Sequence, residues 1–148
     1  MAATHLSGLS ISPLNATAAA VAVTEKDHAG KTVTLNKADG QAVTLPNATG
    51  SGNKFRFVVG TAITSNSTTF KVARAADVMA GQAIVDGTTS TMFQTAADSD
   101  TVTLNGGTTG GLAGTMVEVE DVASNLWYVH VLGNGSGTEA TPFSATVS

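Results

Sequence analysis

Short runs of alternating residues, separated by turn-forming residues, restrict the fold of this chain more than any other feature. From Lys31 onward, Val, Thr, Leu and Phe alternate with each other or with polar residues over short stretches. A period of two places every second side chain on one face of a β-strand. Gly, Asn, Asp and Ser lie between the stretches and favour turns. The pattern therefore predicts an all-β fold.

The alternating stretches predict strands at residues 32–35, 42–45, 55–59, 69–72, 82–85, 92–95, 101–104, 115–119 and 126–132. Asp39-Gly40 lies between the first two and predicts a hairpin. Residues 73–80 predict a short helical turn that ends at Gly81. With 148 residues in the chain, this number of short strands indicates a single-domain antiparallel β-sandwich or barrel over residues 29–148.

The first 28 residues have a different character, and we interpret them as an extended N-terminal arm or edge segment. Pro13 prevents a continuous helix there. The segment either docks on a partner or covers an open edge of its own sheet. The candidate docking residues are four apolar side chains spaced among small ones: Leu6, Leu9, Ile11 and Leu14.

Charge is divided between the two halves of the sequence. All seven basic residues lie between Lys26 and Arg74, so residues 1–74 carry a net charge of +4. Residues 75–148 contain no basic residue and carry −8. This division indicates either an assembly protein with one basic and one acidic surface, or two halves that interleave in the fold so that the signs mix.

Composition excludes several classes of function. Seven Lys and Arg residues in a chain of net charge −4 are too few to neutralise nucleic-acid phosphates. The chain has no run of about 18 apolar residues, so no transmembrane helix is predicted. The chain has no Cys, which removes disulfides and thiolate metal sites. We expect no nucleic-acid or membrane partner.

Motifs for catalysis are incomplete. Gly30-Lys31-Thr32 resembles the end of a phosphate-binding loop, but the earlier glycine is replaced by Glu25 and a strand follows instead of a helix. No Gly-x-Ser-x-Gly elbow is present. The three His residues are too far apart for a local metal motif. We therefore expect a non-enzymatic protein with no cofactor, no metal and no small-molecule substrate.

Two pairs of strand residues are informative. Glu118 and Glu120 are predicted to share one face, where they form a solvated acidic strand, accept a neighbour's Lys or Arg, or bind a hard cation. Trp127 and Tyr128 are adjacent on a strand, so one ring is expected in the core and the other on the surface.

From about Val43 to the C-terminus, the chain resembles small structural virion proteins of tailed bacteriophages. The residues that carry the resemblance are TLPNATGSG at 44–52, FRFVVGT at 55–61, DTVTLNGGTTGG at 100–111, VEVEDVAS at 117–124 and GTEATPFSATV at 137–147. The resemblance implies a capsid decoration, or cement, protein. Such a protein binds the major capsid protein on the outer surface of the phage head, commonly as a homotrimer.

We expect the opposite charges to meet between copies. The hypothesised basic residues are Lys54, Arg56, Lys71 and Arg74, and the hypothesised acidic residues are Glu118, Glu120 and Asp121. The alternatives are a head-fibre or tail-fibre/baseplate module that binds host surface glycans, a free-standing carbohydrate-binding domain and a hydrolase.

Overall fold

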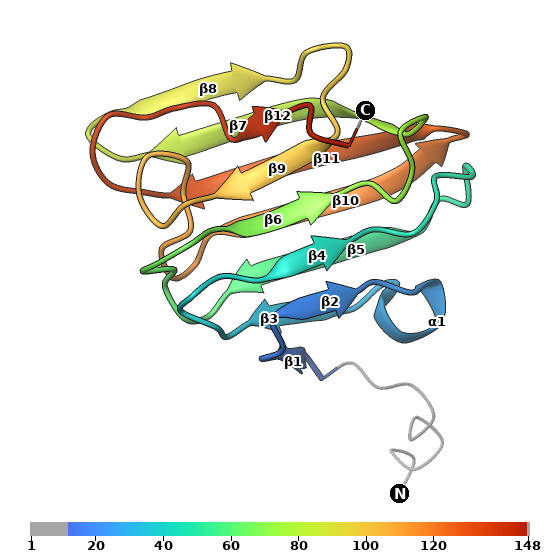
Figure 1. Cartoon of the computed structure of the whole chain (residues 1–148), viewed down its shortest axis with the longest axis horizontal. Helices are drawn as coiled ribbons and strands as arrows, with labels where there is room; N and C mark the ends of the chain where they lie inside the picture. Colours follow the sequence, from blue (N-terminus) through green and yellow to red (C-terminus); the bar gives the residue numbers. More distant parts are fainter. Residues whose placement is uncertain (1–11, 148) are drawn as a thin grey trace, which may run out of the picture.

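The computed structural model describes residues 12–147, which form two β-sheets packed face to face (Figure 1). The larger sheet has seven strands in the spatial order β1 (Leu14–Ala16), β3 (Thr32–Leu35), β5 (Lys54–Val59), β10 (Met116–Ala123), β11 (Leu126–Asn134), β7 (Val78–Asp86) and β8 (Ser90–Gln94). The smaller sheet has five, in the order β12 (Phe143–Ser144), β9 (Thr101–Leu104), β6 (Thr68–Lys71), β4 (Ala42–Thr44) and β2 (Ala20–Ala22).

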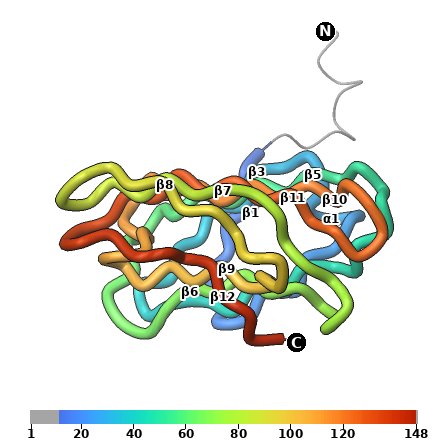
Figure 2. The backbone as a smooth tube through the Cα atoms, turned by 90° about the horizontal axis from the view of Figure 1, so that it is seen from above, coloured from blue at the N-terminus to red at the C-terminus, as the bar shows by residue number. Residues whose placement is uncertain are grey.

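The predicted all-β class is confirmed, and the two packed layers, seen edge-on in Figure 2, are consistent with a sandwich. Every strand predicted from the alternating pattern overlaps an observed strand. The helix among the described residues is α1 (Glu25–His28), a single turn. It begins after Thr24, whose hydroxyl accepts a hydrogen bond from the Asp27 N–H.

The predicted antiparallel arrangement is wrong, because both sheets are mixed. The first six strands alternate between the two sheets, and strands that follow one another within a sheet are parallel. Val33 pairs with Leu14 on one side and with Phe57 on the other, while Val43 pairs with Val21 and Phe70. The chain therefore winds around the core in successive coils, and each parallel crossover is a strand of the opposite sheet.

Two local predictions are also wrong. Asp39-Gly40 does not close a hairpin, because the loop carries the chain from β3 in the larger sheet to β4 in the smaller one. Alternation identifies both strands but does not specify which sheet the second one joins. Residues 73–80 do not form a helical turn: the Asp77 N–H donates to the Arg74 carbonyl in a tight turn, and β7 then begins at Val78.

Residues 14–22 form sheet edges. β1 pairs with β3 in the larger sheet and β2 pairs with β4 in the smaller sheet, at the same end of the sandwich. Of the two alternatives for the N-terminal segment, covering an edge describes these residues. Leu6, Leu9 and Ile11 lie outside the described residues.

The core consists of inward-facing alternate side chains from both sheets. Phe57 and Phe70 meet edge to face across the two layers, with ring centroids 5.1 Å apart. Trp127 is fully buried and its ring centroid lies 5.9 Å from that of Phe55. Tyr128 is 44% exposed. The expectation that one of the two adjacent rings is buried and the other exposed is confirmed.

The two halves of the sequence stay apart in space. In the larger sheet β1, β3 and β5 lie to one side of the strands from the second half, and in the smaller sheet β2, β4 and β6 do the same. The colours of Figure 1 accordingly change from blue at one end of the sandwich to yellow and red at the other. The interleaved alternative is wrong, and the charge division of the sequence persists in the fold.

The parallel strands β7 and β11 approach each other closely at Gly81 of β7. A Cβ atom at Gly81 would overlap the carbonyl oxygen of Val129 on β11. We predict that Gly81→Ala lowers the free energy of unfolding by about 2 kcal/mol, because the paired backbones must separate. Urea denaturation measures this change.

Gly107→Ala is the matched control, since the atom nearest to an added Cβ there lies 3.7 Å away. Its effect is expected to stay within about 0.5 kcal/mol. Equal losses of stability in the two variants would contradict the close approach at Gly81.

Candidate docking surface

The outer face of the larger sheet carries a row of apolar side chains that crosses five strands. Consecutive members are cross-strand partners in register, and we call them the apolar row: Val58, Met116, Leu132, Ile84 and Met92. Leu132 is 43% exposed, Ile84 40% and Met92 60%. Outward positions in a sheet are normally polar when they face water. We therefore take the apolar row as the candidate docking surface of this chain.

A polar row runs beside the apolar row. Its members, again partners in register, are Thr32, Arg56, Glu118, His130, Gln82 and Gln94. One step further along the strands, Lys54 pairs with Glu120 and Glu120 pairs with Tyr128. The face therefore combines an apolar stripe with flanking charges and an exposed phenol, which suits it to bind another protein surface.

The outer face of the smaller sheet is different. Apart from Lys71, its outward residues are small or hydroxylated and include Ala42, Thr44, Thr69 and Thr103. Among the described residues, all five exposed large apolar side chains belong to strands of the larger sheet: Ile84, Met92, Tyr128 and Leu132 point outward in register, and Val122 lies at the bulge of β10. The two faces of the sandwich are thus chemically distinct, and one of them carries the apolar patch.

The structure brings four of the predicted interface residues together, within one copy of the chain. Glu118 is the cross-strand partner of Arg56, and Glu120 is the partner of Lys54. The Lys54 Nζ lies 3.5 Å from the Glu120 Oε2. Both side chains of that pair are partly exposed, so the ion pair contributes little to stability. Opposite charges that the sequence assigned to different copies meet at the β5–β10 boundary of one copy.

Arg74 and Lys71 lie elsewhere. Lys71 projects from the outer face of the smaller sheet. Arg74 lies in the turn before β7, where its Nη2 is 2.6 Å from Asp77 Oδ1 and also donates to the Ala48 carbonyl and the Asn125 side chain. The hydrogen bond to Asp77 raises the pKa of Arg74 above its ordinary value. Arg74 connects two loops of its own chain.

Asp121 does not fit the predicted role in a contact between copies, because it is fully buried. Its carboxylate accepts hydrogen bonds from the backbone N–H groups of Thr49, Gly50 and Ser51 and from the hydroxyls of Thr49 and Ser51. Burial raises the pKa of Asp121, but these hydrogen bonds together outweigh it and lower the pKa to about 2. Asp121 instead holds the loop that precedes β5.

Other acidic side chains of the second half act in the same way. Asp77 accepts from the Ala48 N–H, and Asp100 accepts from the N–H groups of Thr146 and Val147. Glu139 accepts from the N–H groups of Gly87 and Thr89 in the β7–β8 turn, and the backbone bond from Thr89 lowers its pKa. These carboxylates accept hydrogen bonds from backbone N–H groups. They therefore have hydrogen-bond partners although their half of the sequence contains no Lys or Arg.

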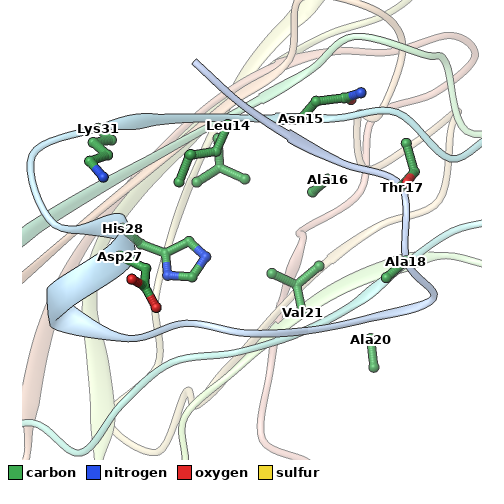
Figure 3. Close-up of a pocket in the computed structure, with 11 residues that line it drawn as sticks. Leu14, Asn15, Ala16, Thr17, Ala18, Ala20, Val21, Asp27, His28 and Lys31 are labelled. Carbon is green, nitrogen blue, oxygen red and sulfur yellow. The ribbon is translucent and has the colours of Figure 1, made fainter. Parts of the chain in front are cut away.

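A hollow of about 530 Å³ lies at the open end of the sandwich, between β1 and β2 (Figure 3). Leu14, Ala16 and Val21 line it with aliphatic groups, and Asp27 and His28 stand at one end. Leu14, the one predicted arm residue that the structure describes, is half-buried and packs against the core. His28 Nδ1 lies 3.1 Å from the Thr24 N–H, within the α1 turn.

Between residues 12 and 147, no three His, Asp or Glu side chains gather closely enough to hold a metal ion. Glu118 and Glu120 share the outer face, as predicted, and each faces a basic residue across the strand pair. In that same part of the chain, no helix has the length and apolarity required to cross a bilayer.

Comparisons of the chain with protein-family models, curated proteins and solved structures found no match.

The apolar row was not predicted from the sequence, although a signal was present. Ala83-Ile84-Val85 and Val131-Leu132 are consecutive apolar residues in segments predicted as strands. Within such a run, one of every two side chains must face outward. The row became visible only when the cross-strand register aligned outward residues from five separate strands.

The role of Asp121 predicts a pH dependence of stability. Its pKa is 3.8 in the unfolded chain and about 2 in the folded protein, so the folded state binds this proton less tightly. The stabilisation is therefore complete above the unfolded pKa and disappears as the pH falls through about 2. Urea unfolding followed from about pH 5 to about pH 2 should show stability decreasing over that window.

Asp121→Asn should lower the free energy of unfolding by about 3 kcal/mol at neutral pH, because buried N–H groups lose a charged acceptor. The difference from the unmodified protein should shrink as the pH approaches 2. The exposed Asp98 supplies the control Asp98→Asn, whose effect should stay within about 0.5 kcal/mol. A deficit in Asp121→Asn that is the same at every pH would refute this assignment.

Proposed function

We propose that this protein is a structural component of a tailed-bacteriophage particle that decorates and stabilises the outer surface of the capsid. It binds the major capsid protein non-covalently across the joints between capsid subunits. The observation that carries the proposal is the apolar row on the outer face of the larger sheet. The sequence resemblance supplies the setting, and the outer face supplies a surface with which to bind.

The energetics of the face suit this role. Covering Leu132, Ile84 and Met92 removes partly exposed apolar area from water, and each fully buried side chain of this kind contributes about 1.5–3 kcal/mol. One such contact is weak, but a shell repeats it over many symmetric positions. A binding protein with few mobile parts loses less entropy on docking. The carboxylates that hold the loops to the sandwich reduce that cost.

On this proposal the copies bind the head as homotrimers, which is the arrangement that the resemblance implies. The chain contributes no catalysis and requires no cofactor. The N-terminal segment, with Leu6, Leu9 and Ile11, adds apolar anchors to the docking. Binding strength then comes from shape and apolar contact, and the charges of Arg56 and Glu118 beside the apolar row help to select the orientation of the copy.

Cosedimentation tests the proposal. The probes are expanded heads and proheads prepared without this protein, from the phage that carries its gene. The unmodified protein should sediment with expanded heads, whereas Leu132→Lys should lose at least about tenfold in affinity, because a charge replaces an apolar contact. Failure of the unmodified protein to bind either shell would disprove the capsid role.

Val122→Lys is the matched control, because Val122 is 44% exposed and lies at the bulge of β10, outside the apolar row. It should bind heads as the unmodified protein does. Equal losses in Leu132→Lys and Val122→Lys would contradict docking through the apolar row. Circular dichroism and urea unfolding confirm that each variant is folded.

The second candidate function is a head-fibre or tail-fibre/baseplate module that binds host surface glycans. The exposed ring of Tyr128, flanked across the strand by Glu120, favours it, because sugars stack on aromatic faces beside polar groups. Specific binding on a glycan array, abolished by Tyr128→Ala and unchanged in Leu132→Lys, would support this second function over capsid decoration.

A further inference from the structure

β8 is an open edge of the larger sheet, since its one strand neighbour among residues 12–147 is β7. Beyond the two ends of β8, the Thr95 N–H donates to the Gly81 carbonyl and the Gly87 N–H donates to the Thr89 carbonyl. Antiparallel strands alternate their bonding residues. Thr91 and Phe93 therefore bond to β7, and Ser90, Met92 and Gln94 direct their N–H and C=O groups to the open edge.

This edge lacks the features that prevent edge-to-edge pairing. Such features are charged side chains, Pro, bulges or very short length. Ser90–Gln94 has five residues with no charge and no Pro, and its register with β7 has no bulge. At its centre Met92, the most exposed member of the apolar row at 60%, ends that row at the sheet margin. The apolar row therefore extends to the unpaired edge of the sheet.

We propose that a second copy of this chain supplies that strand. The two β8 strands pair antiparallel about a two-fold axis that passes between the two Met92 residues, perpendicular to the sheet. Met92 then faces Met92 of the second copy, and Ser90 faces its Gln94. The three residues of each strand whose N–H and C=O groups point to the open edge exchange about six backbone hydrogen bonds with the second copy. No charged side chain is placed opposite another by this register.

The symmetry joins the two apolar rows. Residues directly opposite each other in an antiparallel pair project to the same face, so Met92 from both copies connects the rows into one stripe. The two docking surfaces then face the same way and can engage one partner surface together, which raises the overall affinity. This two-fold contact forms in solution without any capsid, so it does not depend on the proposed function, and it is separate from the three-fold contacts of the proposed trimer.

Electrostatics give the contact a distinctive salt dependence. The end of the sandwich that carries β8 includes Asp86, Asp98 and Glu139, while every Lys and Arg lies in the other half of the sequence. Two such ends repel each other, and salt screens the repulsion. The pairing should therefore strengthen as NaCl rises from about 0.05 M to about 0.5 M. A contact built on ion pairs between basic and acidic surfaces would weaken instead.

Single-cysteine cross-linking tests the register, because the chain has no native Cys. In the proposed pair the two Met92 Cα atoms lie about 5.5 Å apart, within the range of a disulfide. Met92→Cys alone should form a disulfide-linked dimer under mild oxidation. Ser90→Cys alone should not, because its two copies lie about 14 Å apart along the strands. Ser90→Cys mixed with Gln94→Cys should cross-link to each other.

Sedimentation of the cysteine-free chain completes the test. Met92→Lys should lower the weight-average mass at a given concentration, whereas Val122→Lys should leave it unchanged. Cross-linking of Ser90→Cys with itself as fast as Met92→Cys, or a mass that falls with added salt, would overturn the proposal. If the protein binds capsids but its Met92→Cys variant forms no disulfide-linked dimer under oxidation, this contact is disproved and capsid decoration is left intact.

Discussion

Burial of the inner faces of two sheets is the interaction on which the rest of this structure depends. Trp127, Phe55, Phe57 and Phe70 occupy the space between the layers and are essentially inaccessible to water. Successive side chains of a strand point to opposite faces of the sheet. Burying these residues in the core therefore also determines which residues point outward. A shift of one residue in any strand would bring its core residues to the surface. The apolar row on the opposite face of the larger sheet is therefore a surplus that the core does not require.

The charge division and the carboxylates connect the sequence to the rigidity of the fold. Opposite charges meet along the boundary between β5 and β10, where Arg56 faces Glu118 and Lys54 faces Glu120. Asp77, Asp100, Asp121 and Glu139 accept hydrogen bonds from backbone N–H groups, and Asp121 is the clearest example. A carboxylate that accepts several backbone bonds holds a loop as a cap holds a helix end. The charged side chains of this protein thus form ion pairs and hydrogen bonds within a single copy of the chain.

Much of the secondary structure was predictable, and most of the topology was not. Period-two alternation located β3 to β11 but not β1, β2 or β12, and adjacency on a strand assigned opposite environments to Trp127 and Tyr128. The hairpin at Asp39-Gly40 failed because local turn chemistry cannot reveal that β3 and β4 belong to different sheets. Asp121 was predicted to be a surface acid because the groups that donate hydrogen bonds to its carboxylate lie about 70 residues earlier in the chain. The apolar row needed the register of five strands, which no single segment contains.

We propose that the outer face of the larger sheet is the surface that contacts a partner. The most direct measurement is a cryo-electron microscopy reconstruction of phage heads with the protein bound, at a resolution that traces strands. We expect β10, β11 and β7 to face the shell, with Leu132 and Ile84 covered by capsid protein. Density that places the smaller sheet, with Thr44 and Thr69, against the shell and leaves the apolar row in solvent would contradict it.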